Sequence, residues 1–177
     1  MITKNIKSRI KEYFMLYPTK KLRVRQIERE LNLPLPSIIR YTKELEQEGI
    51  IKNEQITNIK AYSADRSSKY FILEKKLFNI KSIYDSGLID YLIKNYDNPN
   101  IILFGSYSKG EDIEKSDIDI YIETTKKVER ISENLEKELK RKIQIFRYKN
   151  INEIENKELA NNIINGIKLN GFLEIFK

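Results

Sequence analysis

The sequence contains neither cysteine nor histidine among its 177 residues. Without cysteine the chain forms no disulfide, offers no thiolate nucleophile and has no cysteine-based zinc site. Without histidine it lacks a Ser-His-Asp triad and the commonest side-chain ligand of transition metals. Metal chemistry is therefore restricted to hard cations such as Mg²⁺, which are held by oxygen ligands.

Long apolar segments are also missing. No run approaches the roughly 20 apolar residues that a membrane-spanning helix needs. The continuous apolar core of a signal peptide is absent from the N-terminal residues MITKNIKSRIKEYF. We therefore expect a soluble, cytoplasmic protein with no membrane partner.

The positive charge of the chain is unevenly distributed. Residues 1–68 hold 14 Lys/Arg and 8 Asp/Glu, whereas residues 69–177 hold 19 and 18, so almost all of the net +7 belongs to the first segment. A small basic domain favours a polyanionic partner. A solvated surface carries such charge equally well, so the charge supports this interpretation without proving it.

The most distinctive motif lies at residues 101–123, IILFGSYSKGEDIEKSDIDIYIE. Alternate side chains of a strand share one face, so Asp117 and Asp119 are expected to point the same way. Two such carboxylates repel each other unless a cation lies between them, and Mg²⁺ is typically held by one or two carboxylates together with substrate phosphates. Small residues such as Gly105 and Ser106, at a turn from strand to helix, let backbone N–H groups approach a phosphate. The motif predicts a phosphate-binding turn that faces a Mg²⁺ (or Mn²⁺) site.

This pattern, G-S-x(10)-D-x-D within residues 86–170, resembles the nucleotidyltransferase superfamily that includes DNA polymerase beta. The minimal nucleotidyltransferases of bacteria and archaea are the most similar members. The resemblance implies that Gly105 and Ser106 contact the triphosphate of an NTP and that Asp117 and Asp119 are catalytic and bind two Mg²⁺ ions. One ion would orient the triphosphate, and the other would activate a hydroxyl for attack on the α-phosphate. Lys109 either neutralises phosphate charge or is a solvated loop lysine.

One element of the family pattern is missing. The full site has a third carboxylate on the strand after the intervening helix, here residues 142–146, and the matching position is Gln144. An amide is not a base and is a poor Mg²⁺ ligand, which puts transfer chemistry in question. Two carboxylates plus phosphates still suffice to hold one Mg²⁺. Glu123 shares the strand face of Asp119 but is more simply a surface acid.

The resemblance and the hydrophobic periodicity together predict an α+β domain at residues 86–177, with a small mixed β-sheet flanked by helices. The expected helices and strands are as follows: helices at 88–96, 128–139 and 151–164, and strands at 101–104, 118–122, 142–146 and 167–169. Residues 69–85 are predicted to be a linker helix whose apolar stripe packs as core.

Residues 1–68 are predicted to be a separate domain. Helices are expected at 3–17, 26–31 and 37–48, with a short strand at 22–24 and a hairpin at 50–63. This order resembles a winged helix-turn-helix over residues 1–64. On the third helix Ile38, Thr42 and Leu45 should face the core.

The winged helix-turn-helix resemblance implies binding to duplex DNA, with the third helix in the major groove. The residues expected to contact DNA lie on that helix, before the second helix, and on the wing: Ser37, Ile39, Arg40, Tyr41 and Lys43; Arg23 and Arg25; Lys52 and Lys60. The alternative is a winged helix used only for protein contact or dimerisation.

Three functions remain open on the sequence alone. The first is a DNA-binding protein that transfers a nucleotidyl group from Mg-NTP to a hydroxyl acceptor, for example on a toxin partner protein. The second is a transcriptional regulator whose degenerate nucleotidyltransferase domain only senses nucleotide, through the helix at 69–84. The third is a scaffold that binds neither ligand. The sequence does not determine the base, the acceptor, the DNA sequence or whether the chain is a homodimer.

Overall fold

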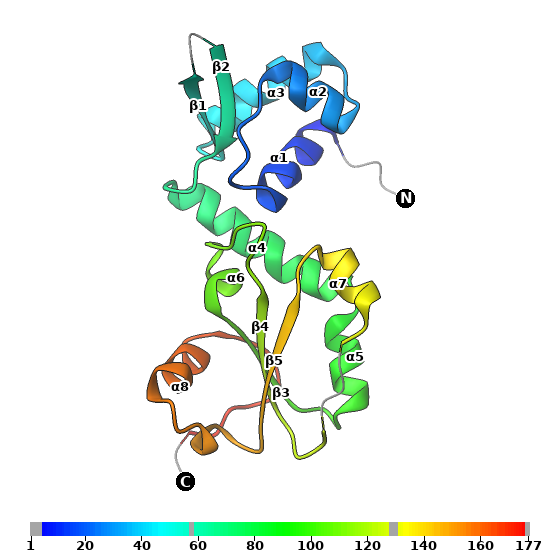
Figure 1. The fold of residues 1–177 in the computed structure, drawn as a ribbon, viewed down its shortest axis with the longest axis vertical. Coiled ribbons are helices and arrows are strands. Elements are labelled where there is room, and N and C mark those ends of the chain that lie inside the picture. Colours follow the sequence, from blue (N-terminus) through cyan, green and yellow to red (C-terminus); the bar gives the residue numbers. More distant parts are fainter. Residues whose placement is uncertain (1–4, 57–58, 128–130, 176–177) are drawn as a thin grey trace. The chain divides into compact units, whose positions relative to one another are not determined.

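The structure is a computed structural model, and it describes residues 5–56, 59–127 and 131–175. The chain divides into two compact units, Met1–Phe78 and Asn79–Lys177. Figure 1 shows the helices and strands of both units, and we describe each unit by itself.

Three helices and a β-hairpin make up the first unit, and helix α4 begins in it. Their bounds are α1 Ile6–Leu16, α2 Val24–Leu31, α3 Leu35–Gln47, β1 Ile51–Ile56, β2 Ile59–Ala64 and α4 Lys69–Asp85. The Asn5 side chain accepts a hydrogen bond from the Lys7 amide and so caps the start of α1. Pro36 lies in the first turn of α3, where a missing N–H costs nothing, and Gly49 with φ +69° follows its end.

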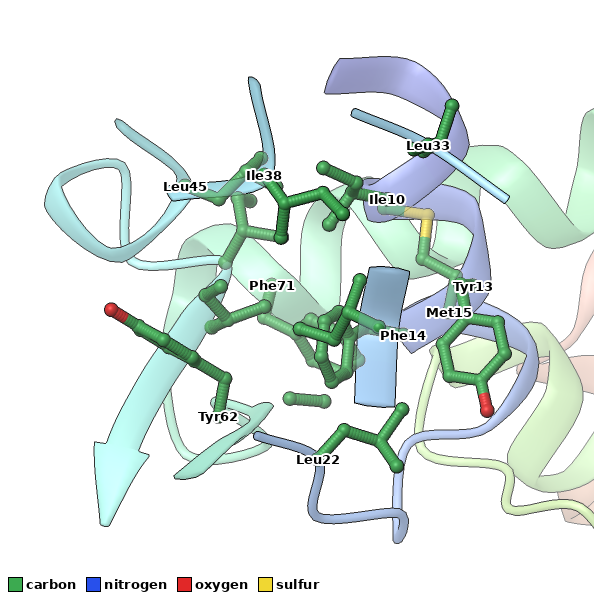
Figure 2. Close-up of a cluster of buried hydrophobic side chains, with 14 residues drawn as sticks. Ile10, Tyr13, Phe14, Met15, Leu22, Leu33, Ile38, Leu45, Tyr62 and Phe71 are labelled. Carbon is green, nitrogen blue, oxygen red and sulfur yellow. The ribbon is translucent and has the colours of Figure 1, made fainter. Parts of the chain in front are cut away.

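One apolar cluster forms the core of the first unit (Figure 2). Ile10 and Phe14 of α1 pack there with Ile38 and Leu45 of α3, and Phe71 of α4 joins them. All five side chains are at most 1% exposed, and burial of each typically contributes about 1.5–3 kcal/mol. The burial of Ile38 and Leu45, and of Thr42 between them, agrees with the face predicted from their spacing.

The strand predicted at residues 22–24 is wrong. Only Leu22 pairs, as an isolated bridge to Tyr62, and Val24 already begins α2. The reason is a local cap: the Gln26 side chain accepts a hydrogen bond from the Arg23 amide at 2.8 Å, and the helix starts two residues earlier than expected.

A mixed four-stranded sheet with the order β5-β4-β3-β6 organises the second unit (Figure 1). β3 pairs antiparallel with β4 and with β6, and β4 pairs parallel with β5. The elements are α5 Leu88–Asn95, β3 Asn100–Phe104, α6 Gly105–Lys109, β4 Ile118–Glu123, α7 Glu133–Leu139, β5 Ile143–Tyr148, a 3-10 turn Ile151–Glu153, α8 Lys157–Ile164 and β6 Ile167–Asn170. The α+β class and the small mixed sheet are as predicted.

The two faces of this sheet carry separate apolar clusters. Ile118, Ile120 and Ile122 of β4 pack on the face that α5 and α7 cover, whereas Tyr121 packs on the other face with Ile163 of α8. Figure 1 shows α8 on one side of the sheet and α5 and α7 on the opposite side. Asp119 alternates with the isoleucines and therefore lies on the α8 face.

Two helices differ from their predicted bounds. The helix expected at 128–139 begins only at Glu133, because the Ser132 side chain accepts from the Asn134 amide; residues 128–130 lie outside the described part. The helix expected at 151–164 is divided into the 3-10 turn and α8. The Asn156 side chain accepts from the amides of Glu158 and Leu159 and so caps a new helix.

Among the helices of the described residues, none is long and apolar enough to cross a membrane.

Candidate functional site

The connection from β3 to β4 brings the small residues and the two acids of the motif together. Gly105 follows β3 directly, Asp117 directly precedes β4, and Phe104 pairs with Asp119 in the antiparallel register. Gly105 has φ +72°, and a Cβ on it would collide with the Asp119 carboxylate. Both its backbone conformation and this close approach therefore require glycine.

The two carboxylates differ in environment. Asp119 is half-buried, and burial raises its pKa above the usual range, with the charge of Asp117 raising it further. Asp117 is exposed at the start of the strand. A cation between the carboxylates would relieve the repulsion that raises the Asp119 pKa. The pair therefore fits one hard cation, provided that phosphate or water oxygens complete its coordination.

Backbone and hydroxyl hydrogen bonds hold the turn that follows β3. The Ser108 hydroxyl donates to the Gly105 carbonyl at 2.8 Å, and the Glu111 amide donates to the Ser106 carbonyl at 3.0 Å. Ser106 is half-buried next to Gly105, and Lys109 is exposed at the last position of α6. Contact of Ser106 and Lys109 with phosphate stays a prediction.

Gln144 lies beside Asp119. β4 and β5 are parallel, and their register pairs Asp119 with Gln144, so the two side chains share one face of the sheet. This is the position at which the family resemblance implies a third carboxylate. Within the described residues no group of three or more His, Cys, Asp or Glu side chains is suited to hold a metal.

Glu123 does not replace the missing acid. It lies at the opposite end of β4, four residues beyond Asp119, which is roughly 13 Å of strand. It pairs in register with Asn100, the first residue of β3, and accepts a hydrogen bond from the Asn100 side chain. Glu123 is therefore remote from Gly105 and the two aspartates.

A groove of about 690 Å³ opens beside Asp117, and motif reasoning missed its residues. Lys137 of α7 and Lys140, Arg141 and Lys142 of the α7–β5 connection line it together with Asp117. They lie 20 to 25 positions after Asp117 in the sequence. Parallel pairing of β4 and β5 brings the starts of both strands to one end of the sheet. Had this pairing been predicted, it would have put these four residues near Asp117.

In the first unit, most residues predicted to contact DNA are exposed. The exposed ones are Arg23, Arg25, Ile39, Arg40, Lys43, Lys52 and Lys60, whereas Ser37 and Tyr41 are half-buried. Tyr41 also packs against the core cluster, so only part of its side chain is available for contact with DNA. Its ring lies 5.1 Å from the Arg40 guanidinium, which fixes Arg40 by a cation–π contact.

Several of these cations also pair with acids of the same unit. Arg40 Nε lies 2.9 Å from Glu44, and Lys60 Nζ lies 3.4 Å from Glu46. Exposed pairs of this kind contribute only about 0–1 kcal/mol, so they do not prevent either cation from reaching a phosphate. DNA contact by these residues stays a prediction.

Comparison with known proteins addresses the second unit. Residues 87–170, which run from the residue before α5 to the end of β6, match the family model described as "Polymerase beta, Nucleotidyltransferase". No curated protein matches the chain, and no solved structure matches it. The matched region is somewhat less than half of the chain and contains Gly105, Ser106, Asp117 and Asp119. Residues 87–170 thus carry a nucleotidyltransferase domain of the polymerase beta type.

Proposed function

We propose that the second unit binds a metal-complexed nucleoside triphosphate at Asp117 and Asp119 and transfers its nucleotidyl group to a hydroxyl acceptor. The observation that carries this proposal is the contact of Gly105 with the Asp119 carboxylate inside the matched domain. A small-residue turn that lies directly against the Asp119 carboxylate supports a compact phosphate-and-metal site.

Each residue of the site has a distinct part in this proposal. Asp117 and Asp119 would hold Mg²⁺, which when bound neutralises phosphate charge and supplies Lewis-acid polarisation. Gly105 leaves room for the Asp119 carboxylate and for close approach of the phosphates. Ser108 holds the Gly105 carbonyl and thereby keeps the turn in place. Positioning of this kind provides much of the catalysis in phosphoryl-type transfer.

A second candidate function is nucleotide sensing without transfer. It is favoured by Gln144, whose register position beside Asp119 offers no base and no third carboxylate. In this proposal the domain binds Mg-NTP tightly, and the bound nucleotide alters the state of the protein instead of being consumed.

Incubation with each labelled NTP tests both candidates. The natural chain with Mg²⁺ or Mn²⁺ is compared with the Asp117→Asn/Asp119→Asn variant, and both binding and covalent label on any protein are measured. Transfer predicts label and pyrophosphate release that the variant lacks. Sensing predicts metal-dependent binding without label.

A matched control removes the same charge elsewhere in the unit. Asp90→Asn with Glu138→Gln neutralises two exposed acids of α5 and α7. This control should bind nucleotide like the natural chain. Equal affinity of the natural chain with excess chelator would contradict the metal site, and absence of any nucleotide binding would contradict both candidates.

For the first unit we propose binding to duplex DNA through α3 and the β1–β2 hairpin. The three helices followed by a hairpin, the exposed side chains Ile39, Arg40 and Lys43, and the net +6 of residues 1–68 support it. The exposed Arg40 guanidinium, which lies 5.1 Å from the Tyr41 ring, is of the type that donates two hydrogen bonds to guanine.

DNA titration with the full chain tests this proposal. The binding constant should fall linearly in log[salt], with a slope set by the number of phosphates contacted. Arg40→Ala should cost about 1–3 kcal/mol on the preferred sequence if Arg40 reads a base. Lys157→Ala, which removes an exposed cation from α8, is the control. An equal effect of the two changes would contradict the assignment to α3.

A further inference from the structure

Three polar side chains are buried inside the second unit below the candidate site. Asn79 is fully buried, and the side chains of Asp112 and Arg141 are 0% and 3% exposed. Burying an ion pair carries a desolvation cost that its mutual attraction often only balances. Such a pair therefore contributes little net stability. Its role is better sought in the segments that its contacts hold in place.

These side chains tie together separate parts of the unit. The Asn79 amide of α4 donates to the Asp112 carboxylate at 2.7 Å and to the Tyr107 carbonyl of α6 at 2.8 Å. From the α7–β5 connection, Arg141 Nη2 lies 3.4 Å from the other Asp112 oxygen. Asp112 is thus held from two sides.

The segment between α6 and β4, residues 110–117, contains Asp112 and ends at Asp117, and we call it the site loop. It is closed by a turn in which the Ser116 amide donates to the Ile113 carbonyl and the Ser116 hydroxyl accepts from the Ile113 amide, both at 3.0 Å. Immediately after the loop, the Ile118 amide donates to the Lys142 carbonyl at 2.8 Å.

Two adjacent residues of the α7–β5 connection therefore anchor the site loop at both ends. Arg141 holds Asp112 by its side chain, and Lys142 holds Ile118 by its backbone. Asp117 lies between these anchors, next to the second one. The backbone of Asp117 is therefore held next to the start of β4, the strand that carries Asp119.

We propose that Asn79, Asp112 and Arg141 form a buried polar brace that fixes the site loop and thereby positions the Asp117 carboxylate for metal and nucleotide. None of the three touches the ligand in this proposal, so they are positioning residues. The consequence for ligand binding rests on the proposed function of the second unit, whereas the fixing of the loop does not.

The test removes both members of the ion pair together, so that neither is left without the other. Asp112→Leu/Arg141→Met removes both charges with similar volume, a change that is often neutral or stabilising. The control is Asn170→Ala, which removes the hydrogen bonds of Asn170 to Asn98 and Pro99 at the end of β3 away from Gly105. Three quantities are measured on the full chain: melting temperature, amide hydrogen exchange of residues 110–117 without ligand, and the Kd for Mg-ATP and Mg-GTP.

The brace predicts that the double variant keeps its melting temperature while exchange in the site loop becomes faster. Its Kd for the nucleotide that binds the natural chain should rise about tenfold or more, the scale of outer-shell contacts in metal sites. Asn170→Ala should lower the melting temperature and leave both loop exchange and Kd unchanged.

Two outcomes would overturn the proposal: unchanged exchange in residues 110–117 of the double variant, or faster exchange with an unchanged Kd. Should the double variant fail to fold, Asn79→Ala, which removes one of the two holds on Asp112, is measured in its place and must also speed exchange in the site loop. If the natural chain binds neither nucleotide, the proposed function fails by itself, and the exchange measurement still decides whether the brace fixes the loop.

Discussion

At the residue scale, a comparison of two glycines distinguishes the cost of backbone strain from the effect of displacing a site residue. Gly105 and Gly87 have φ +72° and +74°, a conformation that other residues rarely adopt. A Cβ on Gly105 would meet the Asp119 carboxylate, whereas one on Gly87 would meet nothing within 4 Å. Substitution of either glycine therefore causes backbone strain, but only substitution of Gly105 also causes a collision with Asp119.

We predict that Gly105→Ala and Gly87→Ala each lower the free energy of unfolding by about 1–2 kcal/mol through backbone strain. Only Gly105→Ala should also abolish metal-dependent nucleotide binding, because the methyl group displaces Asp119. Urea unfolding and calorimetric titration with Mg-NTP measure the two effects. Retained binding in Gly105→Ala would show that Asp119 is not held against this turn for ligand binding.

Gln144 is the second residue on which function depends. Its register position beside Asp119 is where an acid would serve as base or further metal ligand. We predict that Gln144→Glu raises the rate of pyrophosphate release in single-turnover experiments, since general-base catalysis typically contributes about 10²–10⁴-fold. Gln144→Met, which removes the amide without adding an acid, should not raise it.

Opposite results would be equally informative. Rapid release by the natural chain that is lost in Gln144→Glu would mean that the catalytic base lies elsewhere. No release from either protein, with nucleotide binding intact, would favour sensing over transfer.

At the element scale, an ion pair joins helices α1 and α3. Its acidic member also binds Arg40, one of the residues predicted to contact DNA. Lys7 Nζ of α1 lies 3.0 Å from the Glu44 carboxylate of α3, which also accepts from Arg40. The hydrogen bond from Lys7, then that from Arg40, lowers the Glu44 pKa below its usual range. Glu44 thus connects the packing of α1 to the orientation of Arg40.

This lowered pKa gives a pH dependence of definite sign. Between its folded and unfolded pKa values, the unfolded state binds more protons at Glu44, so stability falls as the pH is lowered through that window. We predict that the natural chain is more stable than Glu44→Gln at neutral pH and that the difference shrinks as the pH falls from the usual Glu pKa of about 4.3 through the lowered folded value. Thermal unfolding of both chains across this range is the measurement.

The Lys7→Met variant tests whether the hydrogen bond from Lys7 is what lowers the Glu44 pKa. Because Lys7 makes the largest contribution to the lowered pKa of Glu44, its loss should make the difference between Glu and Gln at position 44 smaller. An undiminished difference would contradict the role of Lys7.

At the scale of the whole molecule, the question is whether the two units influence each other's ligands. Helix α4 belongs to both: Phe71 lies in the core of the first unit, and Ile83 lies in a core of the second. Asn79 of the brace is in the same helix. This continuity gives the sensing candidate a physical connection between nucleotide and DNA.

If nucleotide is sensed, we predict that saturating Mg-NTP changes the Kd for duplex DNA by about 5–150-fold and that DNA changes the Kd for NTP by the same factor. Fluorescence anisotropy of labelled DNA and calorimetry with NTP measure the two sides of this linkage. Asp117→Asn/Asp119→Asn should remove the coupling while leaving DNA affinity in the absence of nucleotide unchanged. Independent binding of the two ligands would contradict sensing.

The sequence by itself determined the features that depend on local spacing. Periodicity placed the buried face of α3, the order of helices and strands, and the two acids at the start of β4, because side-chain direction repeats every 3.6 residues in helices and every two in strands. Local capping was harder to predict, since Gln26, Ser132 and Asn156 each start a helix at a residue that periodicity does not specify.

Only the tertiary structure decided what depends on strand register and burial. The family resemblance pointed to Gln144 as the matching position, but the parallel pairing of β4 with β5 is what shows it beside Asp119, and the pairing of Glu123 with Asn100 ties that acid to the start of β3. The burial of Asp112 with Arg141 joins residues 29 positions apart. A sequence read along the chain does not contain these neighbours, because non-local pairing fixes which residues meet across the sheet.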